Sequence, residues 1–81
     1  MAAYRLSIPG MVCGSAVDSI ERTLWNVTGV CGVEAETHEH AVRVEVERDA
    51  GAAELIRAVE RAGFQVTACA ESKAVHLMRY A

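Results

Sequence analysis

Apolar and polar residues alternate with a period of two in four short parts of the chain. These parts are residues 4–8, 33–37, 42–47 and 66–70. Such alternation predicts β-strands that bury one face and expose the other. In the last of them, Val66, Ala68 and Ala70 are expected to face the interior.

Two other segments carry apolar residues three and four positions apart, which is the spacing of an amphipathic helix. In the first helix these residues are Val17, Ile20, Leu24 and Val27, and in the second they are Leu55, Ile56, Val59 and Ala62. Gly29 and Gly63 follow the two segments, at positions where a helix commonly ends. Pro9 and Gly10 end the first strand, and residues 38–40 form the turn between the second and third strands.

The predicted order of elements is strand, helix, strand, strand, helix, strand. Right-handed crossovers place both helices of such a chain on the same face of the sheet. We therefore expect an α+β fold, the ferredoxin-like βαββαβ open-faced sandwich with a four-stranded antiparallel sheet. Residues 1–72 are expected to form this domain, and residues 73–81 a C-terminal tail that is either a frayed end or an additional edge strand.

Length and charge narrow the range of functions. A chain of 81 residues forms one domain, and its formal net charge of -3 does not suit a nucleic-acid partner. It contains no apolar run of about 18 residues that would span a membrane. Its first residues lack the basic region and the apolar core of a secretory signal. We expect a cytoplasmic protein that neither binds nucleic acid nor inserts into a membrane.

The three cysteines are odd in number and far apart, so they do not suggest a disulfide framework. Cys31 and Cys69 lie within apolar strand segments, and we expect both thiols to be packed in the core. Cys13 differs because it immediately precedes the first helix. The helix dipole favours a thiolate there and lowers the pKa of the thiol. An exposed thiolate of this kind is either a metal ligand or a nucleophile.

The string Gly10-Met11-Val12-Cys13, placed between a strand and a helix in this order of elements, resembles the heavy-metal-associated domain. Residues 27–30 resemble the exit of the first helix in that family, and residues 54–64 resemble its second helix and the following turn. The resemblance extends from Leu6 to about Ala70. The family includes copper chaperones and the N-terminal modules of copper- and zinc-exporting P-type ATPases.

The resemblance implies a metal-binding and transfer module, not an enzyme. Cu(I) is the expected cargo, with zinc as an alternative, and the expected partner is a metal-transporting P-type ATPase or another metal-handling protein. In this family the position of Met11 packs beneath the metal loop, and the aromatic residue at Phe64 screens the loop cysteine from water. Trp25 falls between the buried positions of the first helix, so part of its ring should be exposed.

The chain departs from the family pattern at Ala16, where the second metal-binding cysteine is expected. Since a methyl group cannot coordinate a metal, Cys13 supplies only half of the usual two-sulfur site. Four sources of a second ligand are open. They are Cys13 of a second chain in a metal-bridged homodimer, a thiol from glutathione or a partner protein, His38 or His40 in the turn, and His76 or Met78 in the tail.

Two functions without a metal compete with this hypothesis. A degenerate domain of the same fold would act in docking or regulation, with Cys13 incidental. A monothiol redox protein would use Cys13 as a nucleophile, but the only proline, Pro9, precedes the cysteine, and the chain has no nearby resolving thiol. The expected open face of the sheet also lacks the stacking aromatic residues of an RNA-binding sandwich.

Overall fold

The predicted order of elements is confirmed by a computed structural model, which describes residues 2–47 and 51–72. Within these residues the elements are β1 (Ala2–Ser7), α1 (Gly14–Trp25), β2 (Val30–Glu36), the short 3-10 helix η1 (Thr37–Glu39), β3 (Ala41–Val46), α2 (Ala52–Arg61) and β4 (Ala68–Ser72). The expected tail at residues 73–81, including His76 and Met78, lies outside the described residues, as do residues 1 and 48–50. Neither described helix is long and apolar enough to span a membrane.

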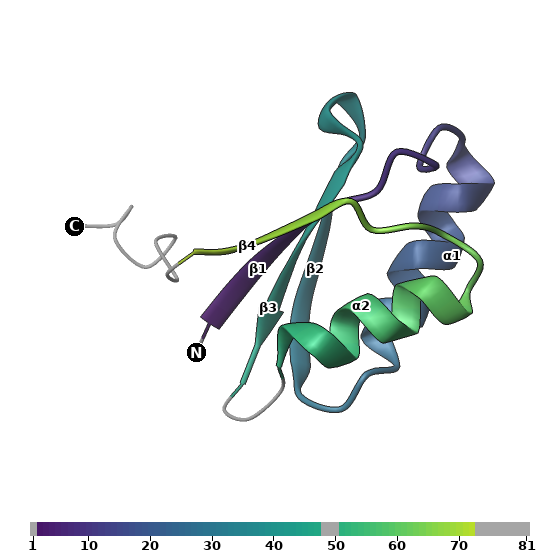
Figure 1. Ribbon diagram of the computed structural model, residues 1–81. Helices are drawn as coiled ribbons and strands as arrows, with labels where there is room; N and C mark the ends of the chain where they lie inside the picture. The colour runs from purple at the N-terminus through teal and green to yellow at the C-terminus, as the bar shows by residue number, and fades with distance from the viewer. Residues whose placement is uncertain (1, 48–50, 73–81) are drawn as a thin grey trace.

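The described strands form one antiparallel sheet in the order β2-β3-β1-β4, and both helices cover the same face of it (Figure 1). Because β1 and β2 each pair antiparallel with β3, they run in the same direction. The turn after β2 therefore lies at the same end of the sheet as the loop that leads from β1 into α1. One backbone hydrogen bond joins the two loops, since the Ile8 N–H donates to the His40 carbonyl at 2.7 Å.

The core lies between the sheet and the helices. Val44 of β3 lies opposite Tyr4 on one side and Val33 on the other, which places apolar side chains of three strands on the helix-covered face. The helices add the predicted stripes, and the buried residues of these stripes are Ile20, Leu24, Leu55 and Val59. No described side-chain nitrogen or oxygen is buried without a hydrogen-bond partner. Burial of apolar surface is therefore the main stabilising term.

The helix ends confirm one glycine prediction and correct the other. Gly63 follows α2 with a φ of 98°, a conformation that favours glycine. α1 ends at Trp25 and is capped by Asn26, so Val27 belongs to the following turn, where it packs against the core. Gly29 has a φ of 94° in this turn, and it does not cap the helix directly.

The predicted alternation in the last strand is wrong. β4 begins at Ala68, and its register places Cys69 opposite Leu6 on the helix-covered face and Ala70 opposite Arg5 on the open face. Val66 contacts the core from the segment before the strand. Alanine loses little free energy on exposure, so an alanine pattern specifies the register of a strand weakly.

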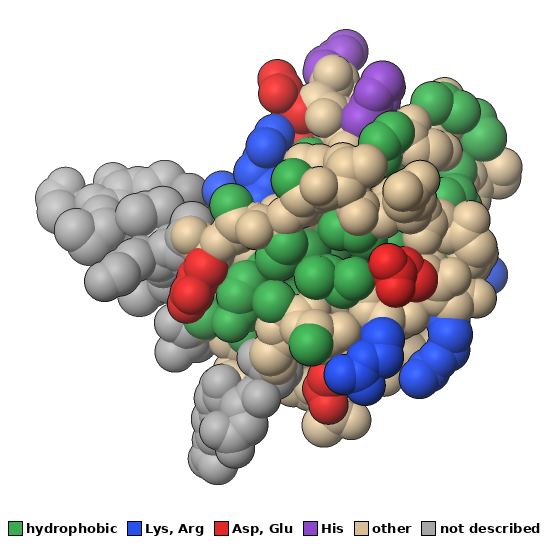
Figure 2. Space-filling model, viewed as in Figure 1, with side chains coloured by type: hydrophobic (Ala, Val, Ile, Leu, Met, Phe, Trp, Pro, Cys, Tyr) green, Lys and Arg blue, Asp and Glu red, His purple; other side chains and the backbone are tan. Residues whose placement is uncertain are grey.

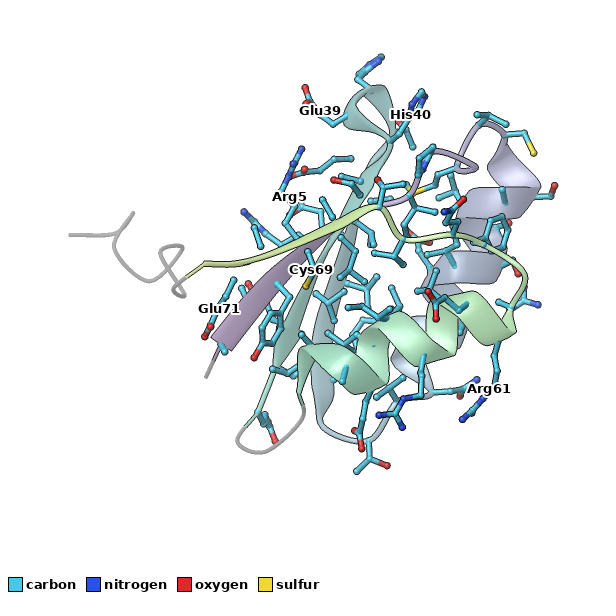
Figure 3. The ribbon with its side chains drawn as sticks, in the orientation of Figure 1. Arg5, Glu39, His40, Arg61, Cys69 and Glu71 are labelled. Carbon is cyan, nitrogen blue, oxygen red and sulfur yellow. The ribbon has the colours of Figure 1, made fainter. Side chains whose placement is uncertain are left out.

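Cys31 and Cys69 are exposed, so the prediction that both thiols are packed in the core is also wrong. Both lie on strands at the edges of the sheet that the described residues form. Cys31 falls at an irregularity in the pairing of β2 with β3, between Val30 and Gly32, where the ladder skips a residue. Cys69 lies on β4, at the opposite edge of the sheet (Figure 3). An edge strand is paired on one side only, which leaves its side chains less covered.

Candidate metal site

Met11 anchors the loop between β1 and α1, residues 8–13, which we call the metal loop. The Met11 side chain is 1% exposed and belongs to the core, as predicted, and its N–H donates to the Ile8 carbonyl at 3.0 Å. The neighbouring Val12 side chain is 71% exposed. The Val12 N–H donates to the Gly10 carbonyl at 2.9 Å, which tightens the turn. The loop therefore has one buried anchor and presents the residues that follow to solvent.

Cys13 occupies the N-cap of α1 and is exposed. Its Sγ lies 3.4 Å from the Ser15 hydroxyl oxygen. The Ser15 hydroxyl and then the backbone N–H groups of Ala16 and Ser15 lower the pKa of the Cys13 thiol, against a smaller opposing effect of desolvation. Since Sγ makes no capping hydrogen bond of full geometry, the amide contacts are weak ones. The arrangement favours a thiolate that solvent and other molecules can reach.

The Cys69 thiol lies in a different environment. Partial burial and the Glu71 carboxylate raise the pKa of the Cys69 thiol. Figure 3 labels Cys69 and Glu71 at β4, away from the metal loop. Ala16 is half-buried in the first turn of α1 and contributes no donor atom. Within the described residues, no three side chains of His, Cys, Asp or Glu converge closely enough to hold a metal ion.

A hollow of about 320 Å³ connects the metal loop to the turn after β2. The residues that border it are Met11, Val12, Cys13, Gly14, Val17, Asp18, Thr37 and His40. Figure 2 shows both described histidines at this end of the molecule. His38 borders a different hollow, of about 560 Å³, together with Arg5 and Glu39. The structure therefore brings His40, but not His38, to the hollow of Cys13.

Two bordering residues, Asp18 and Thr37, were not identified from the sequence. Asp18 lies four positions after Gly14 in α1, so helical spacing places both on the same face. Thr37 begins η1 and accepts a hydrogen bond from the His40 N–H at 3.2 Å. The position of Asp18 beside Gly14 could have been predicted from the helical spacing of the sequence. The position of Thr37 could not, because it depends on how the turn folds.

The predicted screening role of Phe64 is wrong, although its predicted location is right. A Cβ atom at Gly10 would lie 3.4 Å from Phe64 Cδ1, which places the ring against the loop. The ring does not border the Cys13 hollow, and the Cys13 side chain is exposed. Phe64 thus packs on the β1 side of the loop. The Trp25 side chain is 52% exposed, as its helical position predicts.

A model of the family described as heavy-metal-associated domain matches residues 5–65 of the chain. The chain belongs to the heavy-metal-associated domain family. Comparison with curated proteins gives no match. The family assignment agrees with the ferredoxin-like fold and with the position of Cys13 between β1 and α1. Ala16 is the position at which this member lacks the expected second cysteine.

Several solved structures are similar to this member of the family. One, described by the words crosstalk between Cu(I) and Zn(II) homeostasis, is 31% identical with a TM-score of 0.75, covering 79% of this chain and 93% of that chain. A copper-binding domain from HMA7, a P-type ATPase, is 25% identical with a TM-score of 0.82, and the match covers 89% of this chain and 99% of that chain. The N-terminal domain of PacS from Synechocystis PCC6803 is 28% identical with a TM-score of 0.71, and the match covers 88% of this chain and 97% of that chain.

Proposed function

We propose that this domain binds a soft metal ion, foremost Cu(I), through the Cys13 thiolate and passes it to the thiolates of a partner. The observation that carries the proposal is the exposed Cys13 at the N-cap of α1, with a lowered pKa, in a heavy-metal-associated domain. Soft thiolate ligands select Cu(I). Transfer proceeds by ligand exchange, in which a partner's sulfur binds before Cys13 is released. No catalytic acid or base takes part, and we propose that the domain is not an enzyme.

An outside thiolate can bind the same ion because the site is open. Ala16 provides no donor, and both Val12 and Cys13 are exposed. The incoming sulfur belongs to a partner protein, to a small thiol such as glutathione, or to Cys13 of a second chain. In the last case the ion bridges a homodimer. An exposed loop suits all three, because each requires only close approach to one thiolate.

The likeness to a P-type ATPase domain supports a metal-transporting ATPase, or another metal-handling protein, as the partner. Such exchange takes place in the cytoplasm, where thiols stay reduced. The likeness to a structure concerned with Cu(I) and Zn(II) supports zinc as the alternative cargo. Zinc prefers four ligands, so Cys13 needs more outside donors for zinc than for Cu(I).

A metal-free docking domain is the second candidate. Its support comes from the missing donor at Ala16 and from a hollow of about 510 Å³ between α1 and α2, which Arg57 and Arg61 border. Within the described residues, neither arginine forms an ion pair. A redox role for Cys13 is a weaker alternative, which rests only on the lowered pKa of an exposed thiol.

The test is an anaerobic titration of the reduced domain with Cu(I) against a chromogenic chelator, with Cys13→Ser and Ala16→Cys as variants. We expect the wild type to compete for Cu(I) and Cys13→Ser to lose this competition. Ala16→Cys should bind more tightly, since two sulfurs satisfy a two-coordinate Cu(I). One copper per two chains indicates the bridged homodimer. A wild type that folds but never competes with the chelator would refute metal transfer and leave the docking domain.

A further inference from the structure

We propose that His40 supplies a second, nitrogen donor to the ion held by Cys13, so that one chain binds one soft ion through sulfur and nitrogen. The proposal rests on the proposed function, since it requires Cys13 to bind the ion. Its basis is that Cys13 and His40 border one hollow of about 320 Å³ from different parts of the fold. The imidazole would hold the second position until a partner's thiolate replaces it.

The two donors share an anchor at the end of β1. The Ile8 carbonyl accepts a hydrogen bond from the Met11 N–H at 3.0 Å, which positions the loop that carries Cys13. The Ile8 N–H donates to the His40 carbonyl at 2.7 Å, which positions the turn that carries His40. Ile8 itself is completely buried. One completely buried residue is therefore hydrogen-bonded to both loops.

The backbone of His40 is fixed, while its ring is free to bind. His40 has φ 50° and ψ 47°, in the left-handed region that a non-glycine residue seldom adopts. The Arg5 side chain steadies the turn, because Nε donates to Glu36 Oε1 at 2.8 Å and Nη2 donates to Glu39 Oε1 at 3.5 Å (Figure 3). The His40 ring is exposed and forms no hydrogen bond or ion pair within the described part of the chain.

The chemistry of the hollow selects a soft or borderline ion. Imidazole nitrogen binds copper and zinc, and a thiolate with one nitrogen can complete a two-coordinate Cu(I) site. The Met11 side chain is buried beneath the loop. Asp18 also borders the hollow, but its carboxylate oxygen is a hard donor and suits Cu(I) poorly. Val12 and Val17 add apolar side chains to the border of the hollow, and Thr37 adds a polar one.

His38 provides a matched control, because it lies two residues away in the same turn but borders the hollow of Arg5 and Glu39 instead. We would compare His40→Asn with His38→Asn, since asparagine tolerates the left-handed backbone of His40 and removes the imidazole. The probe is Cu(I) alone, in buffer without thiols, against a chromogenic chelator. We expect His40→Asn to weaken Cu(I) binding at least about tenfold, and His38→Asn to leave it within about twofold.

A second readout does not depend on any variant folding. Long-range ¹H–¹⁵N spectra of the wild type report the ring nitrogens of all three histidines, His38, His40 and His76, as Cu(I) is added. A nitrogen of His40 should shift while those of His38 and His76 stay in place. The proposal is overturned if Cu(I) binds through Cys13 and the His40 nitrogens do not move, or if His76 shifts instead. Absence of Cu(I) binding by the wild type would refute the proposed function itself.

Discussion

Met11 lies two residues before Cys13, and its side chain is either a structural anchor of the loop or a metal ligand. Its side chain is 1% exposed and packs in the core. Met11→Ala should therefore cost about 2–5 kcal/mol of unfolding free energy. A domain of 81 residues has roughly 4–12 kcal/mol in total, so the loss is a large part of its stability. The melting temperature should fall by at least about 8 °C, because each kcal/mol corresponds to about 4–8 °C at this size.

Met11→Leu separates the two roles of the side chain. It keeps the volume, so it should cost less than about 1.5 kcal/mol, and it removes the thioether sulfur. Urea unfolding of the metal-free protein gives the stability of both variants, and Cu(I) competition at a temperature where each is folded gives the affinity. We expect Met11→Leu to bind Cu(I) as the wild type does. A tenfold weaker affinity for Cu(I) in a stable Met11→Leu protein would show that the Met11 sulfur is a ligand, despite the burial of the side chain.

Two further predictions concern the thiol and the backbone. The rate of Cys13 alkylation, measured by peptide mass spectrometry as pH rises, should have its midpoint below the ordinary pKa of a thiol. Ser15→Ala should move this midpoint upward, because the Ser15 hydroxyl is the largest cause of the lowered pKa. The alkylation midpoint of Cys69, whose pKa is raised by partial burial, serves as the internal control. An unchanged Cys13 midpoint in Ser15→Ala would remove the hydroxyl from the explanation. Gly63→Ala should destabilise the domain by about 1–2 kcal/mol through its positive φ alone, since nothing lies within 4 Å of the added Cβ. A Cβ at Gly14, the first residue of α1, also meets nothing within 4 Å, so Gly14→Ala should stabilise the domain by about 0.5 kcal/mol. Equal changes in the free energy of unfolding for the two variants, measured in urea, would contradict the backbone argument.

The fold was predictable because each central element carries a strong hydrophobic pattern. Val42, Val44 and Val46 are large and β-branched, and all three are completely buried in β3. The prediction for the last strand failed because Ala68 and Ala70 differ little in free energy between a buried and an exposed position. Pairing with β1 determines which face of the sheet each alanine occupies. A burial rule based on residue type fails at sheet edges, and it therefore missed the exposure of Cys31 and Cys69.

The candidate site was only partly predictable. The environment of Cys13 follows from its place before a helix, which is a local property of the sequence. The sequence does not distinguish His38 from His40, because both lie in one turn. The structure distinguishes them, since they border different hollows and His40 has a left-handed backbone. Asparagine, aspartate and histidine are enriched in this conformation, but no sequence rule says which of two histidines adopts it.

The construction of the site explains how a member of this family can keep its fold while its donor set changes. Ile8 holds both loops through backbone hydrogen bonds, and Met11 holds the metal loop through burial. None of these interactions involves the side chain at Ala16. The side chain at position 16 can therefore differ without breaking these interactions, whereas its identity decides whether the ion finds a second sulfur near Cys13. Without that sulfur, the described residues offer a borderline nitrogen donor at the same hollow in His40, whose turn Ile8 holds beside the loop.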